Sequence, residues 1–281
     1  MTGDFNGDGR TDIMNHNTAG QLRIFPSTGD LTADNKLFTN SYIVGGGWTT
    51  SSYPRIITGD FNGDGRTDIM NHNTAGQLRI FPSTGDLTAD NKLFTNSYIV
   101  GGGWTTSSYP RIITGDFNGD GRTDIMNHNT AGQLRIFPST GDLTADNKLF
   151  TNSYIVGGGW TTSSYPRIIT GDFNGDGRTD IMNHNTAGQL RIFPSTGDLT
   201  ADNKLFTNSY IVGGGWTTSA FPRIITGDFN GDGRTDIMNH NTAGQLRIFP
   251  STGDLTADNK LFTNSYIVGG GWTISSFPRL F

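Results

Sequence analysis

Apolar and polar residues follow one order along this chain, and that order returns every 56 residues, as from Gly3 to Gly59. Short apolar stretches alternate with segments rich in Gly, Asp, Asn, Ser and Thr, which is typical of strands joined by turns. In the second unit, strands are expected over residues 55–60, 67–72, 77–81 and 91–100. Turns are expected over residues 62–65 and 73–76, and a loop over residues 82–90. The pattern leaves no place for a helix.

The unit is written five times, with repeats that start near residues 3, 59, 115, 171 and 227. One unit of this size cannot bury its own apolar face and must stack on copies of itself. Four strands in each of five units predict an all-β fold, a five-bladed β-propeller of four-stranded antiparallel blades. Residues 1–281 are expected to form this single propeller domain.

The two ends of the chain predict how the ring closes. Met1 and Phe281 occupy the same position of the repeat, and Leu280 and Phe281 correspond to Ile56 and Ile57. The last residues can therefore complete a strand whose other half lies at the N-terminus. We expect a monomeric ring closed by this shared N- and C-terminal strand, because closure removes an exposed sheet edge.

Composition narrows the class of partner. The formal net charge of −5 argues against a nucleic-acid partner, and no apolar run approaches the roughly 18 residues of a membrane span. The chain has no cysteine, so disulfides are excluded, and it begins inside a repeat without a signal peptide. The near-identity of the units indicates a designed or consensus repeat, or a very recent amplification.

The segment from Asp4 to Asp12, D-F-N-G-D-G-R-T-D, places side-chain oxygens at loop positions 1, 3, 5 and 9. Ca²⁺ takes about six to eight oxygen ligands, and Gly9 allows the sharp turn that such a loop needs. Three aspartates in a short loop would repel one another without a cation. The alternative is that Asn-Gly and Asp-Gly simply form a hairpin turn. We expect a structural Ca²⁺ in each repeat, up to five in the chain.

The expected ligands include the arginine of each loop through its backbone carbonyl. They are Asp4, Asn6, Asp8, Arg10, Asp12, Asp60, Asn62, Asp64, Arg66, Asp68, Asp116, Asn118, Asp120, Arg122, Asp124, Asp172, Asn174, Asp176, Arg178, Asp180, Asp228, Asn230, Asp232, Arg234 and Asp236.

A second segment, Gly45–Trp48, joins three glycines to a tryptophan, and Asp34 and Asn35 precede it. An aromatic face with a few polar groups is the usual composition of a small-molecule pocket, and glycine permits close backbone approach. Alternatives remain open at this point. The tryptophan can fill the gap between blades, the Asp-Asn pair can be a turn, and Tyr42 is expected to pack. Arg55 is expected to form ion pairs near the propeller axis.

The motif G-G-G-W, followed by S-S-Y-P-R-I-I and preceded by A-D-N-K-L-F, resembles tachylectin-type propeller lectins. The aspartate loop lacks the closing glutamate of an EF-hand and is similar to the FG-GAP loop of integrin-like propeller lectins. The resemblance implies a secreted protein that binds N-acetylglucosamine and related acetamido sugars between adjacent blades. The implied sugar-binding residues are Asp34, Asn35, Gly46, Gly47, Trp48, Asp90, Asn91, Gly102, Gly103, Trp104, Asp146, Asn147, Gly158, Gly159, Trp160, Asp202, Asn203, Gly214, Gly215, Trp216, Asp258, Asn259, Gly270, Gly271 and Trp272.

These features predict a multivalent carbohydrate-binding lectin with structural calcium. An enzyme is not expected, because a glycosidase needs two carboxylates in unlike environments and every aspartate here has four equivalents. The alternatives are a designed symmetric scaffold without a ligand and an integrin-like surface that binds proteins.

Overall fold

The computed structural model describes residues 1–272 except 33–34, 39, 50, 89–90, 95, 106, 145–146, 151, 162, 201, 207, 218–222, 242, 257–258 and 263. These described residues form strands, turns and loops, and no helix. The strands are β1 (Thr2–Gly3), β2 (Asp12–His16), β3 (Leu22–Phe25), β4 (Tyr42–Gly45), β5 (Ile56–Gly59), β6 (Asp68–His72), β7 (Leu78–Phe81), β8 (Tyr98–Gly101), β9 (Ile112–Gly115), β10 (Asp124–His128), β11 (Leu134–Phe137), β12 (Tyr154–Gly157), β13 (Ile168–Gly171), β14 (Asp180–His184), β15 (Leu190–Phe193), β16 (Tyr210–Gly213), β17 (Ile224–Gly227), β18 (Asp236–His240), β19 (Leu246–Phe249) and β20 (Tyr266–Gly269).

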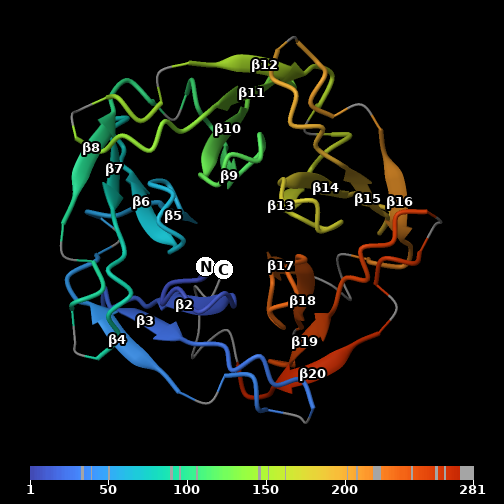
Figure 1. Ribbon diagram of the computed structural model, residues 1–281, viewed down its shortest axis with the longest axis horizontal. Helices are drawn as coiled ribbons and strands as arrows, with labels where there is room; N and C mark the ends of the chain where they lie inside the picture. Colours follow the sequence, from blue (N-terminus) through green and yellow to red (C-terminus); the bar gives the residue numbers. More distant parts are fainter. Residues whose placement is uncertain are drawn as a thin grey trace.

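The strands form five antiparallel sheets, each made of four strands that follow one another in sequence. The sheets surround a central axis as blades, with the first strand of each blade nearest the axis and the fourth on the circumference (Figure 1). The predicted five-bladed propeller is confirmed. The first three strands of the second repeat are within two residues of the expected ranges.

The fourth strand is shorter than the sequence pattern predicts. It begins at Tyr98, whereas residues 91–97 were expected to belong to it. Thr84 explains the difference, because its amide donates to the carbonyl of Leu93 and its hydroxyl to that of Lys92. The segment therefore bonds to its own preceding loop instead of pairing with β7.

The second strand of each blade is buried on both faces, because it lies between two neighbouring blades. All five residues of β6 are buried. Ile69 packs in a cluster with Met14 of the preceding blade, whereas Met70 packs in a cluster with Ile125 of the following blade. Because successive side chains of a strand point to opposite faces of the sheet, this one strand contributes to the interfaces with both neighbouring blades. Each of the five core clusters joins two blades, and the cluster of Ile13 and Met238 joins the last blade to the first.

The ring also closes through backbone hydrogen bonds between described residues. The amide of Thr67 donates to the carbonyl of Asp4 at 2.7 Å, and the amide of Thr11 donates to that of Asp228 at 2.9 Å. Equivalent bonds therefore join blade one to blade two and blade five to blade one. The predicted completion of a strand by Leu280 and Phe281 falls outside the described residues.

Candidate functional site

The aspartate loop joins the first and second strands of each blade. In the first repeat, Oδ1 of Asp4 accepts bonds from the amides of Gly7 at 2.8 Å and Asp8 at 3.0 Å. Its Oδ2 accepts a bond from the amide of Gly9 at 2.8 Å. Gly7 and Gly9 have φ angles of 77° and 83°, which glycine adopts without the strain of a Cβ. One carboxylate therefore organises the whole turn.

Asp12 closes the loop from inside the protein. Its side chain is fully buried, and its two oxygens accept bonds from the amides of Phe5 at 3.2 Å and Ser27 at 2.9 Å. Burial raises the pKa of Asp12 to about 7 despite these two bonds, and the charges of Asp8 and Asp4 raise it further. Burial also raises the pKa of Asp4.

The arginine of the loop does more than the sequence pattern predicted. The guanidinium of Arg10 forms an ion pair with Asp8 at 2.7 Å, and its Nε donates to the carbonyl of Ser27 at 3.0 Å. The same ion pair occurs in all five loops. The loop pattern pointed only to the carbonyl of this residue and not to the ion pair, although an arginine follows an aspartate by two residues in every loop.

The donor set of the loop suits a hard cation, because it consists of carboxylate, amide and carbonyl oxygens. Each oxygen of Asp12 accepts one described bond and has a second lone pair. In the part of the chain that the structure describes, no three acidic or histidine side chains are gathered so that they could hold a metal. Backbone amides and Arg10 hold the carboxylates in this arrangement. Calcium stays a prediction.

The aspartate loop also forms part of the contact between blades. The carbonyl of Phe5 accepts a bond from the hydroxyl of Ser83 in the next blade at 2.9 Å. A Cβ atom on Gly7 would lie 3.2 Å from Cγ of Arg66, which belongs to the next loop around the ring. A change in one loop therefore reaches its neighbour directly.

The tryptophans of the glycine-tryptophan segments lie in the interfaces between blades. Trp48 is 7% exposed, and its ring centroid is 4.4 Å from that of Tyr53 and 4.8 Å from that of Phe81 in the next blade. Trp104, Trp160 and Trp216 are equally buried, and Trp272 is half-buried. The indoles thus fill the gap between blades, which was the alternative to a sugar contact in the sequence interpretation. A contact with sugar stays a prediction. Gly46 and Gly47 are exposed, and a Cβ on either would meet nothing within 4 Å.

The Asp-Asn loops approach the glycine-tryptophan segments of the preceding blade. The amide of Asn203 donates to the carbonyl of Ile155 in β12 at 3.4 Å, and the ring of Phe94 lies 6.4 Å from that of Trp48. The asparagines are exposed and adopt left-handed φ angles of 59° to 63°, which this residue tolerates better than most. Asp202 is exposed, whereas Asp34, Asp90, Asp146 and Asp258 lie outside the described residues.

Comparison with known proteins identifies the repeat. The FG-GAP-like repeat profile matches residues 4–71, 60–127, 116–183 and 172–239. This chain belongs to the FG-GAP-like repeat family. A search of curated proteins finds no match for the FG-GAP-like chain. Among solved structures, a lectin of Agrocybe aegerita, described as specifically recognising non-reducing terminal N-acetylglucosamine, matches with 16% identity and a TM-score of 0.49. The match covers 98% of this chain and 81% of that one. No described helix of the FG-GAP-like chain is long and apolar enough to cross a membrane.

The outer rim of this FG-GAP-like propeller carries exposed tyrosines that the sequence analysis assigned to packing. Tyr42 is 39% exposed, and its four equivalents Tyr98, Tyr154, Tyr210 and Tyr266 are 38–41% exposed. The expectation for Tyr42 was wrong because β4 is the outermost strand of its blade and no further strand covers its ring. Tyr154 immediately precedes Ile155, whose carbonyl accepts the bond from Asn203. An exposed aromatic ring and a left-handed asparagine thus lie at one blade boundary.

The histidines of the FG-GAP-like repeats lie at the inner part of the same boundaries. Nε2 of His72 contacts the backbone carbonyl of Trp104, which assigns the proton of a neutral ring to that nitrogen. Burial lowers the pKa of His72, and the nearby charge of Arg55 lowers it as well. Nδ1 of His72, His128 and His184 and Oδ1 of Asn127 are buried without a described partner. Such atoms are normally bonded to ordered water.

Proposed function

We propose that this FG-GAP-like propeller is a multivalent carbohydrate-binding protein for N-acetylglucosamine and related acetamido sugars. The observation that supports the proposal most directly is at one blade boundary. There, exposed Tyr154 precedes Ile155, whose carbonyl accepts a bond from the amide of Asn203 in the next blade. The repeat places an equivalent tyrosine and asparagine in each blade. The acetamido class follows from the sequence resemblance to tachylectin-type lectins, and it determines the choice of probe.

The chemistry of the boundary suits a neutral sugar. A tyrosine ring offers a flat apolar face to the C–H face of a pyranose and a hydroxyl to the solvent. The side chain of Asn203 has two N–H donors and a carbonyl acceptor, which can bond to hydroxyl or acetamido groups. Gly158 and Gly159 are exposed and leave open space beside the outer strand. A ligand could therefore approach the backbone there.

Each site is expected to be weak, with a Kd of about 10⁻³ to 10⁻⁴ M for a monosaccharide, because few contacts must offset the lost freedom of the ligand. Five equivalent sites on one ring could raise the avidity for a glycan-coated surface by about 10² or more. Binding of this kind needs no bond-making step, and we propose no catalytic residue.

Calorimetry with N-acetylglucosamine at millimolar concentration tests the proposal. We expect five equivalent sites per chain and a loss of binding heat when the rim tyrosines Tyr42, Tyr98, Tyr154, Tyr210 and Tyr266 are all replaced by alanine. The matched control replaces the exposed turn residues Thr18, Thr74, Thr130 and Thr186 by alanine and should bind as the parent does. Absence of heat with the parent chain would favour the scaffold without a ligand.

We also propose one structural Ca²⁺ in each aspartate loop. Asp4, Asn6, Asp8 and Asp12, together with the carbonyl of Arg10, would hold it in the first repeat. When bound, the ion would supply positive charge among three carboxylates. The all-oxygen donor set and the glycine φ angles support the proposal. In the alternative, the amide bonds and the ion pair of Arg10 with Asp8 hold the loop without a cation. Thermal unfolding with calcium and with a chelator distinguishes the two.

A further inference from the structure

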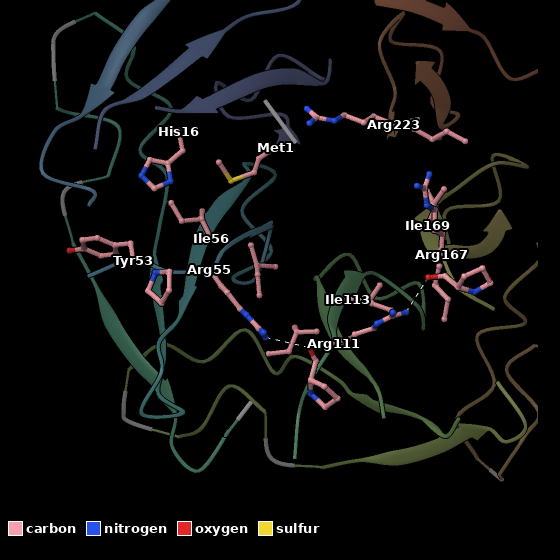
Figure 2. A pocket seen from close by; sticks show the side chains of 17 residues that line it. Met1, His16, Tyr53, Arg55, Ile56, Arg111, Ile113, Arg167, Ile169 and Arg223 are labelled. Carbon is pink, nitrogen blue, oxygen red and sulfur yellow. Dashed lines mark hydrogen bonds between the residues drawn. The ribbon is translucent and has the colours of Figure 1, made fainter. Parts of the chain in front are cut away.

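A cavity of about 840 Å³ lies on the propeller axis, at the end where the innermost strands begin (Figure 2). Three repeats line its described wall with the sequence Pro-Arg-Ile-Ile, and a fourth adds Arg223 and Ile224. The arginines on the described wall are Arg55, Arg111, Arg167 and Arg223. Figure 2 shows these labelled side chains around the cavity. The symmetry of the ring thus gathers at one place cations that are 56 residues apart in sequence.

The described wall of this axial cavity contains no carboxylate. Besides the arginines, the titratable groups of the described wall are His16, Tyr53 and the α-amino group of Met1. Each aspartate loop contains an ion pair of its own, and these loops follow the other end of the innermost strands. Arg55 donates to the carbonyl of Pro110 at 3.4 Å, and Arg111 to that of Pro166 at 3.2 Å. A guanidinium has five N–H donors, so a single bond of this kind orients the group of Arg55 or Arg111 and leaves donors for a ligand.

Several guanidinium groups around one cavity repel one another, and arginine does not lose its proton in proteins. Apolar walls, here isoleucines such as Ile56 and Ile112, lower the local dielectric constant and strengthen both this repulsion and the attraction of a counter-ion. The net charge of the chain is −5, so the positive cavity is a local feature and not a consequence of overall charge. A ligand with several negative oxygens would remove the repulsion.

We propose that the axial cavity binds one compact, multivalent oxyanion of the phosphate type. The planar fork of arginine matches the oxygens of a phosphate group in pairs, which a single ammonium cannot do. A ligand on the axis meets all the arginines at once, and for this reason one ring binds one anion. That stoichiometry distinguishes the axial site from the rim sites proposed for sugar, of which the chain has five.

Calorimetry with inorganic tripolyphosphate, in buffer freed of metal by chelating resin, tests this inference. We expect one ligand per chain and an affinity that falls steeply as salt rises. The axial variant replaces Arg55, Arg111, Arg167 and Arg223 by glutamine, and we expect it to lose about 100-fold or more in affinity. The rim variant replaces Arg23, Arg79, Arg135 and Arg191 by glutamine and removes the same charge. Its affinity for the anion should stay within about threefold of that of the parent, because these arginines do not line the axial cavity. Arg79, for example, donates to the hydroxyl of Ser97 next to the outer strand.

A lysine variant at the four axial positions keeps the charge and protects the test against a folding defect. It should bind with the same stoichiometry and the same salt dependence, about tenfold more weakly than the parent, because the fork is lost. Thermal unfolding without anion checks that each variant is folded. The inference would be overturned by absence of binding to the parent, by five ligands per chain, or by equal losses in the axial and rim variants. An affinity of the folded axial variant equal to that of the parent would also overturn it, since the anion would then bind outside the axial cavity.

Discussion

The hydroxyl of Thr2 donates a hydrogen bond to the backbone carbonyl of Thr226 at 3.0 Å, although 224 residues separate the two in sequence. The equivalent hydroxyl of Thr58 donates to the carbonyl of Thr2, and the series continues around the axis through Thr114, Thr170 and Thr226. The five bonds form a closed circle. Blade one is therefore joined to blade five by the same side-chain contact that joins every other pair of blades.

This circle predicts that every boundary between blades depends equally on its threonine. Thr2→Val and Thr114→Val each remove one donor of nearly the same shape and should lower the free energy of unfolding by about 1 kcal/mol. Chemical denaturation measures the change, and Thr→Ser at the same positions should restore most of it. A neutral Thr2→Val beside a destabilising Thr114→Val would show that the boundary between the first and last blades does not hold in solution.

Calcium should stabilise the ring if the aspartate loops bind it. A ligand that binds only the folded state adds about 2.7 kcal/mol per site at a concentration one hundred times its Kd, so millimolar Ca²⁺ should raise Tm strongly relative to chelator. Replacing Asp8, Asp64, Asp120, Asp176 and Asp232 by asparagine should abolish the difference. Equal midpoints for the parent with calcium and with chelator would leave the Arg10–Asp8 pair and the amide bonds as the full account of the loop.

The sequence predicted the number of blades because the repeat is nearly identical in all five units, and it predicted the strands because the turn residues and the alternation act locally. It did not predict the short fourth strand, because the bonds of Thr84 to Lys92 and Leu93 lie within a loop that has the composition of a strand. It also left the role of Trp48 open and wrongly assigned Tyr42 to packing. Whether each ring is covered depends on tertiary packing. Phe81 of the next blade covers Trp48, whereas the ring of Tyr42 is exposed to solvent.

The buried histidines should weaken the fold on mild acidification. Burial lowers the pKa of His128 in the folded state below its ordinary value of 6.5. The unfolded state therefore binds its proton first, and the contribution to stability, complete above about pH 7, is lost as the pH falls through 6.5. Urea unfolding at pH 7.5 and 5.5 tests this by comparison with His128→Gln, which has no titrating ring. Aspartates such as Asp12, whose pKa is raised to about 7, titrate alike in both proteins, so the change in stability on acidification should be less favourable in the parent than in His128→Gln. An equal change in both proteins would contradict the lowered pKa.

The two aromatic positions of one blade boundary should respond to mutation in opposite ways. Trp160 is 7% exposed and lies between Tyr165 of the linker and Phe193 of the next blade, with ring centroids 4.3 and 4.7 Å away. Trp160→Ala should cost about 3–5 kcal/mol of unfolding free energy, because it leaves a cavity in an interface. Tyr154→Ala removes a ring that is 38% exposed and should cost at most about 1 kcal/mol.

Sugar binding should show the reverse order, since the exposed ring is the one a ligand can reach. In a chain where only this boundary is altered, Tyr154→Ala should reduce the number of N-acetylglucosamine sites from five to four without changing Tm appreciably. Trp160→Phe keeps an aromatic ring in the interface and should preserve all five sites while lowering stability modestly. If Trp160→Phe removed a site and Tyr154→Ala did not, the tryptophan would be the sugar contact and the rim tyrosine would not.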